Sequence, residues 1–378
     1  MKILILCNDT KYLVDHRSNI IASLADESHD VLIVSGGDPA WCQHLPDGVT
    51  YHHVPLMRHR FAPWLDFSLI RTYRRLIATE RPDVVHTFTI KPNLYSLIAL
   101  KLNRLTGRHV PRLVLTFPGL GRVFEPGSGW LRRTVVSNML RLGSKNLDYQ
   151  ATFENAFDSS QFADTGIFPA ERCHVLLGAG IDLDHFNARG KARSGPLTFL
   201  FASRLLKAKG AGLFIEAAEL RRRSGSNAAF LVAGPDDPGN PDNLGLDKVK
   251  EGEQGGSVQY IGNLDTSAMA DILAASDVIC LPTLLREGLP RILLEAGAAG
   301  CAVIASDQPS IRSIIPGPEA GWLVAEPNAK KIALAMEKAE ADQDQTRAIG
   351  LSNAERIGAM PVGDASIVAA FKQLYGRN

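Results

Sequence analysis

The sequence predicts an α/β protein built from two doubly wound parallel sheets. Two observations predict this fold class. Short aliphatic runs alternate with amphipathic segments along the whole chain, as expected for strands that are buried on both faces of a parallel sheet. The alternation also begins again near the middle of the chain, and 378 residues exceed what one hydrophobic core usually organises. We therefore expect two domains.

The first domain is expected to span residues 1–187. Residues 2–7 form a continuous aliphatic run, and the pattern predicts a helix from about His16 to Ala25. Three further strands, separated by helical segments, are predicted at 31–35, 83–87 and 112–116. This regular order of strand and helix is typical of a doubly wound sheet.

The second domain is expected to span residues 197–360, after a linker of small and polar residues at 188–196. An amphipathic helix from Val362 to Tyr375 ends the sequence. Five more strands are predicted in this domain, at 197–202, 228–233, 258–261, 278–281 and 302–305. The same architecture is therefore expected twice.

Composition favours a soluble enzyme. Hydrophobic residues make up 45% of the chain and charged residues 21%, which is enough apolar material for two cores and too little charge for disorder. The five cysteines stand singly, without the spacing of a zinc site, so we expect reduced thiols and no metal. No apolar run approaches the roughly 20 residues that span a bilayer, and none resembles a signal peptide, which predicts a cytoplasmic protein.

Positive charge is concentrated in the first domain. Residues 56–145 contain 16 Lys and Arg against 4 Asp and Glu, although the net charge of the chain is +1. No RNP, zinc-finger or helix-turn-helix signature accompanies this charge, which argues against nucleic acid as a partner. An anionic membrane surface or a phosphorylated acceptor fits it better, and the former predicts a peripheral position on the inner face of the cytoplasmic membrane.

Aromatic residues recur at helical spacing within this basic segment. Phe61, Trp64 and Phe67 lie close to five arginines, at positions 58, 60, 71, 74 and 75. Such a stripe either belongs to the core or anchors the protein at a membrane interface, and the sequence leaves both interpretations open. Trp130 with the arginine pair that follows it is a second segment of this type.

A cationic turn follows the first strand of the second domain. Arg204 and Lys209 lie between that strand and the next helix, and ligands of open parallel sheets bind beyond the carboxyl ends of the strands. A planar guanidinium and a flexible ammonium beside a helix N-terminus can neutralise a diphosphate leaving group. The alternative is a pair of solvated surface cations.

Two carboxylates follow the strand that ends at Leu281. The pattern predicts a helix with Pro290 in its first turn, and Glu287 and Glu295 are eight positions apart, about 12 Å on a helix. This distance is comparable to that between the sugar and the ribose of a nucleotide sugar. Carboxylates accept hydrogen bonds from hydroxyls, so each one is suited to a sugar ring. The alternative is an acidic first turn and a surface glutamate.

Together these residues resemble glycosyltransferase family 4, and the resemblance covers nearly the whole chain. The similar segments are Arg-x4-Lys-Gly at 204–210, Glu-x7-Glu at 287–295, and residues 177–186, 299–306 and 321–324. The resemblance implies the GT-B fold, in which two Rossmann-like domains face each other across a cleft, the first binding the acceptor and the second the nucleotide sugar. It also implies that the C-terminal helix, about 361–378, packs back on the first domain.

The family resemblance also implies a reaction. This is a retaining transfer from a nucleotide diphosphate sugar, with UDP the commoner nucleotide among relatives, and without a metal, a cofactor or a covalent enzyme intermediate. Arg204 and Lys209 would stabilise the departing phosphate. Glu287 would hold hydroxyls of the transferred hexose or N-acetylhexosamine, and Glu295 would hold the ribose. Four further residues are expected to line the nucleotide: Gly234, Gly288, Leu289 and Pro290.

Two motifs of the first domain, 85–93 and 116–124, most resemble the branch of the family that acts on polyprenyl-diphosphate-linked sugars in the assembly of bacterial surface glycans. Lys91 in the first motif is either a phosphate ligand or a solvated lysine. Gly119 and Gly121 in the second motif either let the backbone approach a ligand or form a tight turn. A lipid-linked saccharide is therefore the expected acceptor.

Histidines are the next candidates in the first domain. Phe88 and Pro118 stand where many relatives have a histidine, which argues against a catalytic histidine at those positions. His16 and Arg17 start the first predicted helix, above the first strand, where the acceptor is expected to enter. Alternatively, His16 caps that helix.

Other classes of enzyme share parts of this pattern. An NAD-dependent dehydrogenase also has two α/β domains, but no GxGxxG follows the first strand of either domain. A nucleotide-sugar epimerase or another GT-B enzyme shares the architecture, so the fold alone leaves it open. A transferase that acts on a soluble small-molecule acceptor also stays open.

Overall fold

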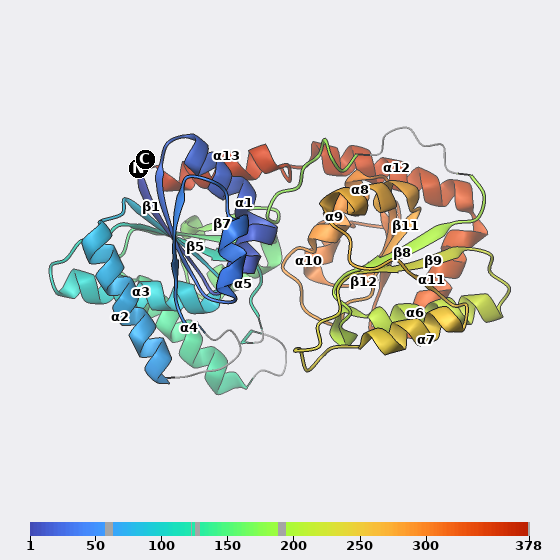
Figure 1. The fold of residues 1–378 in the computed structure, drawn as a ribbon, viewed down its shortest axis with the longest axis horizontal. Helices are drawn as coiled ribbons and strands as arrows, with labels where there is room; N and C mark the ends of the chain where they lie inside the picture. The colour runs from blue at the N-terminus through green and yellow to red at the C-terminus, as the bar shows by residue number, and fades with distance from the viewer. Residues whose placement is uncertain (57–62, 122, 125–128, 188–193, 377–378) are drawn as a thin grey trace. The chain divides into compact units, whose positions relative to one another are not determined.

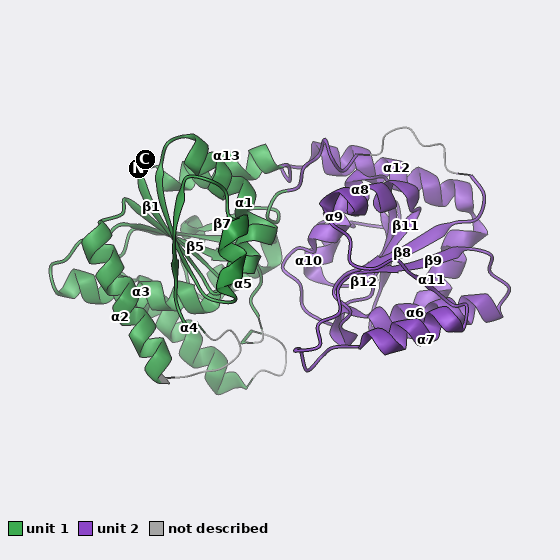
Figure 2. Ribbon diagram, in the orientation of Figure 1, with its two compact units in different colours: residues 1–180, 364–378 green, residues 181–363 purple. Residues whose placement is uncertain are grey.

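The structure is a computed structural model that describes residues 1–56, 63–121, 123–124, 129–187 and 194–376. The chain forms two compact units, drawn in green and purple in Figure 2: unit 1 is residues 1–180 with 364–378, and unit 2 is residues 181–363. Each unit has its own parallel sheet with helices on both faces (Figure 1). The predicted fold class of two doubly wound sheets is confirmed.

Unit 1 has a seven-stranded parallel sheet in the order β3-β2-β1-β4-β5-β6-β7 among its described residues. The sequence pattern missed β3, β6 and β7. The two edge strands, β3 and β7, have mostly exposed or half-buried side chains, so they lack the aliphatic run that marks a central strand. The strands are β1 (Lys2–Cys7), β2 (Asp30–Ser35), β3 (Val49–His53), β4 (Val84–Phe88), β5 (Arg112–Phe117), β6 (Tyr149–Phe153) and β7 (Cys173–Val175).

Two separate cores cover the faces of this sheet. Helices α1 and α13 supply Ile20 and Phe371 to one core, while α2, α3 and α4 supply Tyr73, Leu97 and Leu140 to the other. The helical segments of unit 1 are α1 (Thr10–Asp26), η1 (Pro39–His44), α2 (Pro63–Glu80), α3 (Ile90–Leu105), α4 (Trp130–Ser144), α5 (Ala156–Asp164), η2 (Ala170–Arg172) and α13 (Asp364–Tyr375). Helix α13 packs against α1, where the Lys372 ammonium donates a hydrogen bond to Ser23 (2.7 Å).

Helix α1 begins six residues before the position predicted from the sequence. The side chain of Asp9 caps it by accepting a hydrogen bond from the backbone N–H of Lys11 (3.0 Å). The first helical residues, Thr10 and Lys11, are polar, so the apolar pattern did not reveal them. His16 and Arg17 therefore lie in the second turn, and the interpretation of His16 as the helix cap is wrong.

Among its described residues, unit 2 repeats the strand order of unit 1 with six parallel strands, β10-β9-β8-β11-β12-β13. The strands are β8 (Thr198–Ala202), β9 (Ala229–Ala233), β10 (Gln259–Tyr260), β11 (Val278–Leu281), β12 (Ala302–Ser306) and β13 (Gly321–Val324). The helical segments are η3 (Lys207–Lys209), α6 (Ala211–Arg223), α7 (Leu246–Gln254), α8 (Thr266–Ala275), α9 (Arg291–Ala298), α10 (Pro309–Arg312), α11 (Ala329–Ala341) and α12 (Gln343–Ala359).

The chain passes from one unit to the other at 180/181 and at 363/364, not at the predicted linker 188–196. Ile181 is fully buried, its backbone N–H donates to the carbonyl of Val362 (3.0 Å), and it pairs with Gly363 in a short parallel bridge. These contacts attach residues 181–187 to unit 2, so the predicted boundary at 187 lies seven residues too late. Residues 188–193 of the predicted linker lie outside the described residues.

The strand order reverses between β1 and β4 in unit 1 and between β8 and β11 in unit 2. At such a switch point the connections leave the two strands toward opposite faces of the sheet, and ligands of open α/β sheets bind there. The loops at the carboxyl ends of these four strands are therefore where a site is expected.

Candidate functional site

The switch point of unit 2 brings together two of the residues singled out from the sequence. The ammonium of Lys209, which follows β8, lies 2.6 Å from a carboxylate oxygen of Glu287, which follows β11. The hydroxyl of Thr283 donates to the same oxygen at 3.0 Å. The side chains of Lys209 and Glu287 are 17% and 15% exposed, so the pair is largely but not completely shielded from water.

A glycine places Lys209 beside this loop. Gly210 has φ +84°, and a Cβ added there would lie 2.3 Å from the carbonyl oxygen of Pro282. The turn at the end of η3 therefore closes directly on the segment that follows β11. The sequence motif Lys-Gly thus has a steric basis, because only glycine permits both this backbone conformation and this approach.

Arg204 lies in the same turn but has a different partner. Its guanidinium is 3.3 Å from the carboxylate of Asp237, and the two side chains are 44% and 34% exposed. The adjacent Asp236 accepts a hydrogen bond from Asn243 (2.8 Å), within the loop between β9 and α7. The described residues include no group of three or more His, Cys, Asp or Glu placed to hold a metal.

The helical spacing proposed for the two glutamates is wrong. Helix α9 begins at Arg291, so Glu287 lies in the loop before the helix and a helical rise does not describe its distance from Glu295. Pro290 stands at the N-cap position of α9. The residue before a proline disfavours the helical conformation, so the helix does not include Leu289 and begins only after Pro290. Gly288, Leu289 and Pro290 are all buried in this connection.

Glu295 lies on α9 and is 8% exposed. Its carboxylate is 2.7 Å from the Nε of Arg291, one turn earlier on the helix. Arg291 was not predicted as a site residue. The sequence signal that could have indicated its pairing with Glu295 is their i, i+4 spacing on a helix. The second predicted carboxylate therefore has a cationic partner of its own.

Gly234 packs closely against the backbone at the start of the cationic turn. It follows β9 with φ +135°, and a Cβ added there would lie 1.9 Å from the carbonyl oxygen of Ser203. Its own carbonyl accepts a hydrogen bond from the hydroxyl of Tyr260 (3.0 Å). The structural reason for a glycine here is the close approach of two backbones next to Arg204.

We expect Gly234→Ala to lower the free energy of unfolding by about 2 kcal/mol or more, because it adds a steric clash to a strained backbone. Chemical denaturation of the purified variant measures this. Gly239→Ala is the matched control, since it lies in the same loop with nothing within 4 Å of an added Cβ. Equal stability of the two variants would contradict the steric argument.

In unit 1 the structure shows the surroundings of Lys91 and of the glycines that follow β5. Lys91 lies in the first turn of α3, after β4, and its ammonium is 3.6 Å from the carboxylate of Asp66. The solvated-lysine interpretation is therefore wrong, because these side chains are only 18% and 14% exposed. Gly121, which follows β5, has φ +57°, so the left-handed backbone of the turn favours a glycine at this position. Gly119 lies between β5 and that turn.

Arg17 is buried rather than presented to an acceptor. Its side chain is 1% exposed and donates hydrogen bonds to Glu154 (2.6 Å) and to the hydroxyl of Tyr12 (2.7 Å). The neighbouring His16 is half-buried. Glu154 was missed in the sequence, and its one signal is its place directly after the apolar strand β6. This ion pair joins α1 to β6 across 137 sequence positions, so it serves the fold of unit 1.

His86 of the first motif is also a structural residue. It is fully buried in β4, with its Nδ1 2.6 Å from the hydroxyl of Tyr375 and its Nε2 2.7 Å from the hydroxyl of Thr116. Burial lowers the pKa of His86 well below its usual 6.5. The neutral imidazole therefore connects the central strand of unit 1 to the C-terminal helix.

We expect stability to fall as the pH drops below about 6.5, because the unfolded state then binds a proton that folded His86 does not. The loss from this residue is about 1.4 kcal/mol per pH unit until its folded pKa is reached. Urea denaturation between pH 5 and 8 measures it. His86→Gln should flatten this dependence and the exposed control His52→Gln should not; equal profiles would contradict the assignment.

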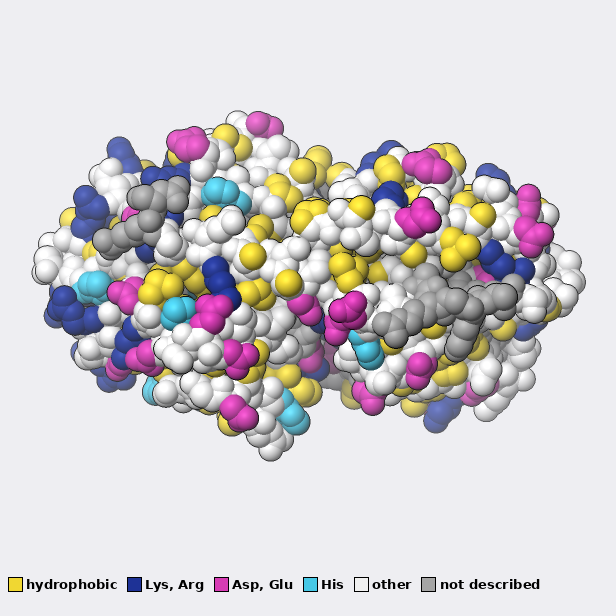
Figure 3. Space-filling view, turned by 90° about the horizontal axis from the view of Figure 1, so that it is seen from above, with side chains coloured by type: hydrophobic (Ala, Val, Ile, Leu, Met, Phe, Trp, Pro, Cys, Tyr) yellow, Lys and Arg dark blue, Asp and Glu magenta, His cyan; other side chains and the backbone are white. Residues whose placement is uncertain are grey.

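The aromatic residues of the basic segment are exposed, so their core interpretation is wrong where the structure describes them. Trp64 and Phe67 on α2 are 88% and 65% exposed, and Trp130 at the start of α4 is 74% exposed. Phe61 and the arginines at 58 and 60 lie outside the described residues. Figure 3 shows several Lys and Arg side chains, in dark blue, at the left end of the view, on unit 1.

Helix α4 carries an exposed apolar stripe that was not expected from the sequence. Leu131, Val135, Met139 and Leu142 follow one another at helical spacing and are 61%, 47%, 37% and 64% exposed. The opposite side of the helix is buried at Val136, Leu140 and Ser144, which is why the stripe cannot join the core. Some cations nearby have structural partners, since Arg141 donates to the carbonyls of Thr165 and Gly166.

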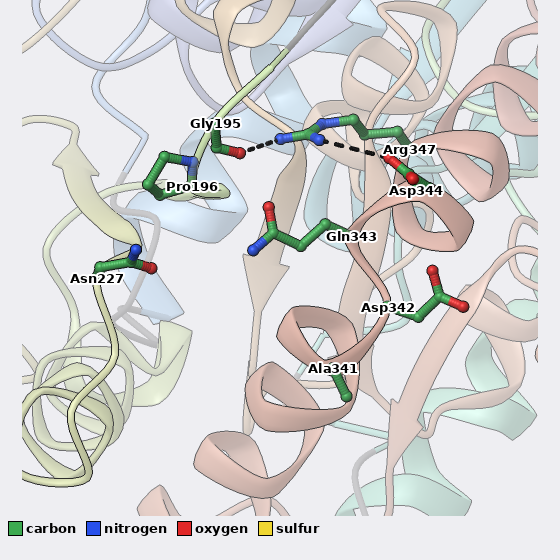
Figure 4. A pocket seen from close by; sticks show the side chains of 8 residues that line it. All are labelled: Gly195, Pro196, Asn227, Ala341, Asp342, Gln343, Asp344 and Arg347. Atoms are coloured by element: carbon green, nitrogen blue, oxygen red, sulfur yellow. Dashed lines mark hydrogen bonds and ion pairs between the residues drawn. The ribbon is translucent and has the colours of Figure 1, made fainter.

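A separate cavity of about 590 Å³ lies at the other end of the unit 2 sheet (Figure 4). It borders Pro196, which precedes β8, so it is at the amino ends of the strands and not at their carboxyl ends. Arg347 in its wall is paired with Asp277 (3.1 Å). None of the candidate residues lines this cavity.

The fold defines the class of protein. HepE of Anabaena in complex with UDP superimposes with a TM-score of 0.75 at 17% identity, and the match covers 99% of both chains. The structure is that of a GT-B protein, with two Rossmann-like units. Residues 15–176 match the model of the glycosyl transferase 4-like domain, and residues 184–356 match that of the glycosyl transferases group 1. The chain belongs to glycosyltransferase family 4 and is a glycosyltransferase.

Two similar curated proteins are named for lipid acceptors. The chain is 26% identical to the phosphatidyl-myo-inositol mannosyltransferase of Mycolicibacterium smegmatis, over 85% of this chain and 79% of that protein. It is 24% identical to the N,N'-diacetylbacillosaminyl-diphospho-undecaprenol alpha-1,3-N-acetylgalactosaminyltransferase of Campylobacter jejuni, over 96% and 94%. A shorter match of 29% covers 46% of this chain and 44% of the amylovoran biosynthesis glycosyltransferase AmsK of Erwinia amylovora.

Proposed function

We propose that this glycosyltransferase moves a hexose or an N-acetylhexosamine from a nucleotide diphosphate sugar, with UDP as the nucleotide, to a lipid-linked diphosphate saccharide, and that it retains the anomeric configuration of the donor. The observation that carries this proposal is the Lys209–Glu287 pair at the switch point of unit 2, at 2.6 Å. The pair offers a cation for phosphate and an acceptor for sugar hydroxyls within one site.

The charge of each side chain in the donor site determines which part of the nucleotide sugar it would bind. Lys209 and Arg204 lie in the turn after β8 and are suited to the negative charge that develops on the departing phosphate. Glu287 would hold hydroxyls of the sugar, and Glu295 the ribose, because a carboxylate would repel the phosphates. The phosphate itself would accept the proton of the acceptor hydroxyl. The two cations support a reaction without a metal, and transfer that persists in EDTA tests this.

The acceptor assignment rests on unit 1 and on the relatives. The C. jejuni protein is named for a diphospho-undecaprenol acceptor and the mycolicibacterial protein for phosphatidyl-myo-inositol. Lys91, in the first turn of α3, is the cation suited to a diphosphate on the acceptor. Its ammonium would leave the Asp66 carboxylate and pair with that diphosphate. The loop with Gly119 and Gly121 follows the adjacent strand and would pass beside it.

Mass spectrometry of the product tests the proposal. The purified protein is incubated with a panel of UDP- and GDP-sugars and two acceptors, a short-chain polyprenyl diphosphate saccharide and its dephosphorylated, soluble sugar. We expect a product one sugar heavier from the lipid acceptor with a UDP-sugar, and NMR of that product to show the donor's anomeric configuration. Transfer to the soluble sugar alone would favour the alternative of a small-molecule acceptor. No transfer from any nucleotide sugar would refute the proposal.

We further propose that unit 1 binds an anionic membrane surface through α2 and α4. The exposed Trp64, Phe67 and Trp130 are the aromatic side chains favoured at such interfaces, and the α4 stripe supplies aliphatic ones. Arg132 and Arg133 are exposed beside that stripe and would meet anionic headgroups. No helix among the described residues is both long enough and apolar enough to cross a bilayer.

Sedimentation with vesicles measures this binding. We expect recovery with phosphatidylglycerol-containing vesicles, decreasing with salt, and little with pure phosphatidylcholine. Leu131→Ser should weaken vesicle binding by about tenfold because it removes one inserted side chain. Leu351→Ser is the matched control, with a leucine of similar exposure (59%) on α12 of unit 2. Equal recovery of both variants, or recovery that ignores lipid charge, would contradict the proposal.

A further inference from the structure

We propose that Gln308 is a positioning residue that holds the loop of Glu287 in the geometry needed for sugar transfer. This inference rests on the proposed function and adds to it a residue that neither the family motifs nor the site geometry alone had assigned. Gln308 follows β12, the strand next to β11, and stands directly before the short helix α10. It reaches across the carboxyl edge of the sheet to the neighbouring loop.

The side-chain amide of Gln308 makes three hydrogen bonds to the main chain of that loop. Its nitrogen donates to the carbonyls of Leu285 (2.8 Å) and Thr283 (3.2 Å). Its oxygen accepts from the backbone N–H of Glu287 itself (3.2 Å). The amide therefore binds alternate residues of the five-residue segment 283–287, and it uses both donors and its acceptor to do so.

Gln308 stands at the N-cap position of α10, but its side chain bonds to the Glu287 loop and not to that helix. A residue directly before a helix can cap that helix with its side chain, yet the Gln308 side chain makes no capping hydrogen bond to α10. Its hydrogen-bonding capacity is directed to the Glu287 loop instead. Leu284 in this segment is 57% exposed and Leu285 is half-buried, so neither leucine is packed into the core. Polar contacts therefore hold this segment in place.

The loop in turn fixes the carboxylate. Thr283 is fully buried, and its hydroxyl donates to the same Glu287 oxygen that faces Lys209. The carbonyl of Thr283 accepts from Ser306 (2.6 Å) as well as from Gln308. A shift of the loop by about 1 Å would separate Glu287 from the sugar hydroxyls and from Lys209, and errors of that size cost about 100-fold in rate.

Gln308→Met tests the inference, because methionine has a similar length but no hydrogen-bonding amide. We expect kcat for sugar transfer to fall by about 30-fold, within the range that misplacement of a reacting group produces, while the dissociation constant of UDP changes by less than about threefold. In the Glu287→Gln background the same substitution should cost less than about threefold, because the residue that it positions is already compromised. Gln308→Glu, which keeps the acceptor and loses the donors, should resemble Gln308→Met.

Asn353→Ala is the matched control. Asn353 is a buried amide of the same unit that donates to two backbone carbonyls, those of Cys301 and Ala320 (both 2.9 Å). It should lower the melting temperature and leave kcat per folded molecule unchanged in both backgrounds. Hydrogen exchange adds a readout that needs no turnover: Gln308→Met should speed exchange of the peptide containing residues 283–287 by tenfold or more.

The outcomes separate the two proposals. A wild-type protein that transfers no sugar would refute the proposed function. An active wild type in which the losses of Gln308→Met and Glu287→Gln multiply fully would overturn the positioning role, as would unchanged exchange in residues 283–287. Coupled losses in kcat, with nucleotide binding retained and accelerated exchange confined to this loop, would establish it.

Discussion

Lys209→Met is expected to lower kcat for sugar transfer by about 1,000-fold and to leave the protein folded. The ammonium is 17% exposed at the switch point of unit 2, and it is the cation nearest the sugar-binding carboxylate in the proposed site. Removing a preorganised positive group from a site where negative charge develops costs roughly 100- to 1,000-fold. The loss should therefore be in kcat more than in the KM of the donor.

Lys207→Met is the control for this prediction. Lys207 lies in the same 3-10 turn, η3, but its side chain is exposed. The two variants remove the same charge from the same three residues, so a nonspecific effect of net charge would appear in both. Initial rates with saturating donor and circular dichroism of both proteins decide the matter. A Lys209→Met enzyme that turns over at a rate close to wild type would exclude the assigned role.

Glu287→Ala is expected to have an effect of similar size, about 1,000-fold in kcat/KM. The substitution removes the proposed acceptor for donor sugar hydroxyls and leaves the largely buried ammonium of Lys209 without its carboxylate partner. Without this partner the Lys209 ammonium would no longer be held in position. The loss in kcat/KM should therefore exceed that caused by removing one hydrogen bond. Affinity for UDP, which lacks the sugar, should change little.

Two comparisons make the Glu287 result interpretable. Glu287→Gln keeps the size of the side chain, so a smaller loss in this variant measures the part that depends on the negative charge. Glu326→Ala removes an exposed carboxylate of unit 2, whose side chain is 94% exposed, and should behave as wild type. Isothermal titration with UDP shows whether the donor site is intact. Glu287→Ala with near-normal turnover would contradict the proposed role.

The central strands and the cationic turn could be predicted from the sequence. A strand buried on both faces must be almost continuously apolar, so β1, β2, β8 and β11 stand out without any structural information. Edge strands such as β3 are half-exposed and carry no such run. The Lys-Gly step of the turn was also visible, because glycine is needed where Gly210 approaches Pro282.

The roles of several charged residues could not be predicted in this way. Arg17 looked like an acceptor ligand until the structure paired it with Glu154 in the interior of unit 1. Arg204 and Lys209 looked like one cationic pair, but their present partners are Asp237 and Glu287. The helical distance between Glu287 and Glu295 failed because Pro290 delays the start of α9.

The sequence by itself determined the two-sheet fold, the family and the residue types of the donor site. Strand periodicity and motif spacing depend on residues that are close together along the chain, so they can be recognised without a structure. Only the tertiary structure decided which charges meet and which residue supports Glu287. Those contacts form where loops from β8, β11 and β12 converge at the carboxyl edge of one sheet, and the strand order that brings them together is set by packing over the whole unit.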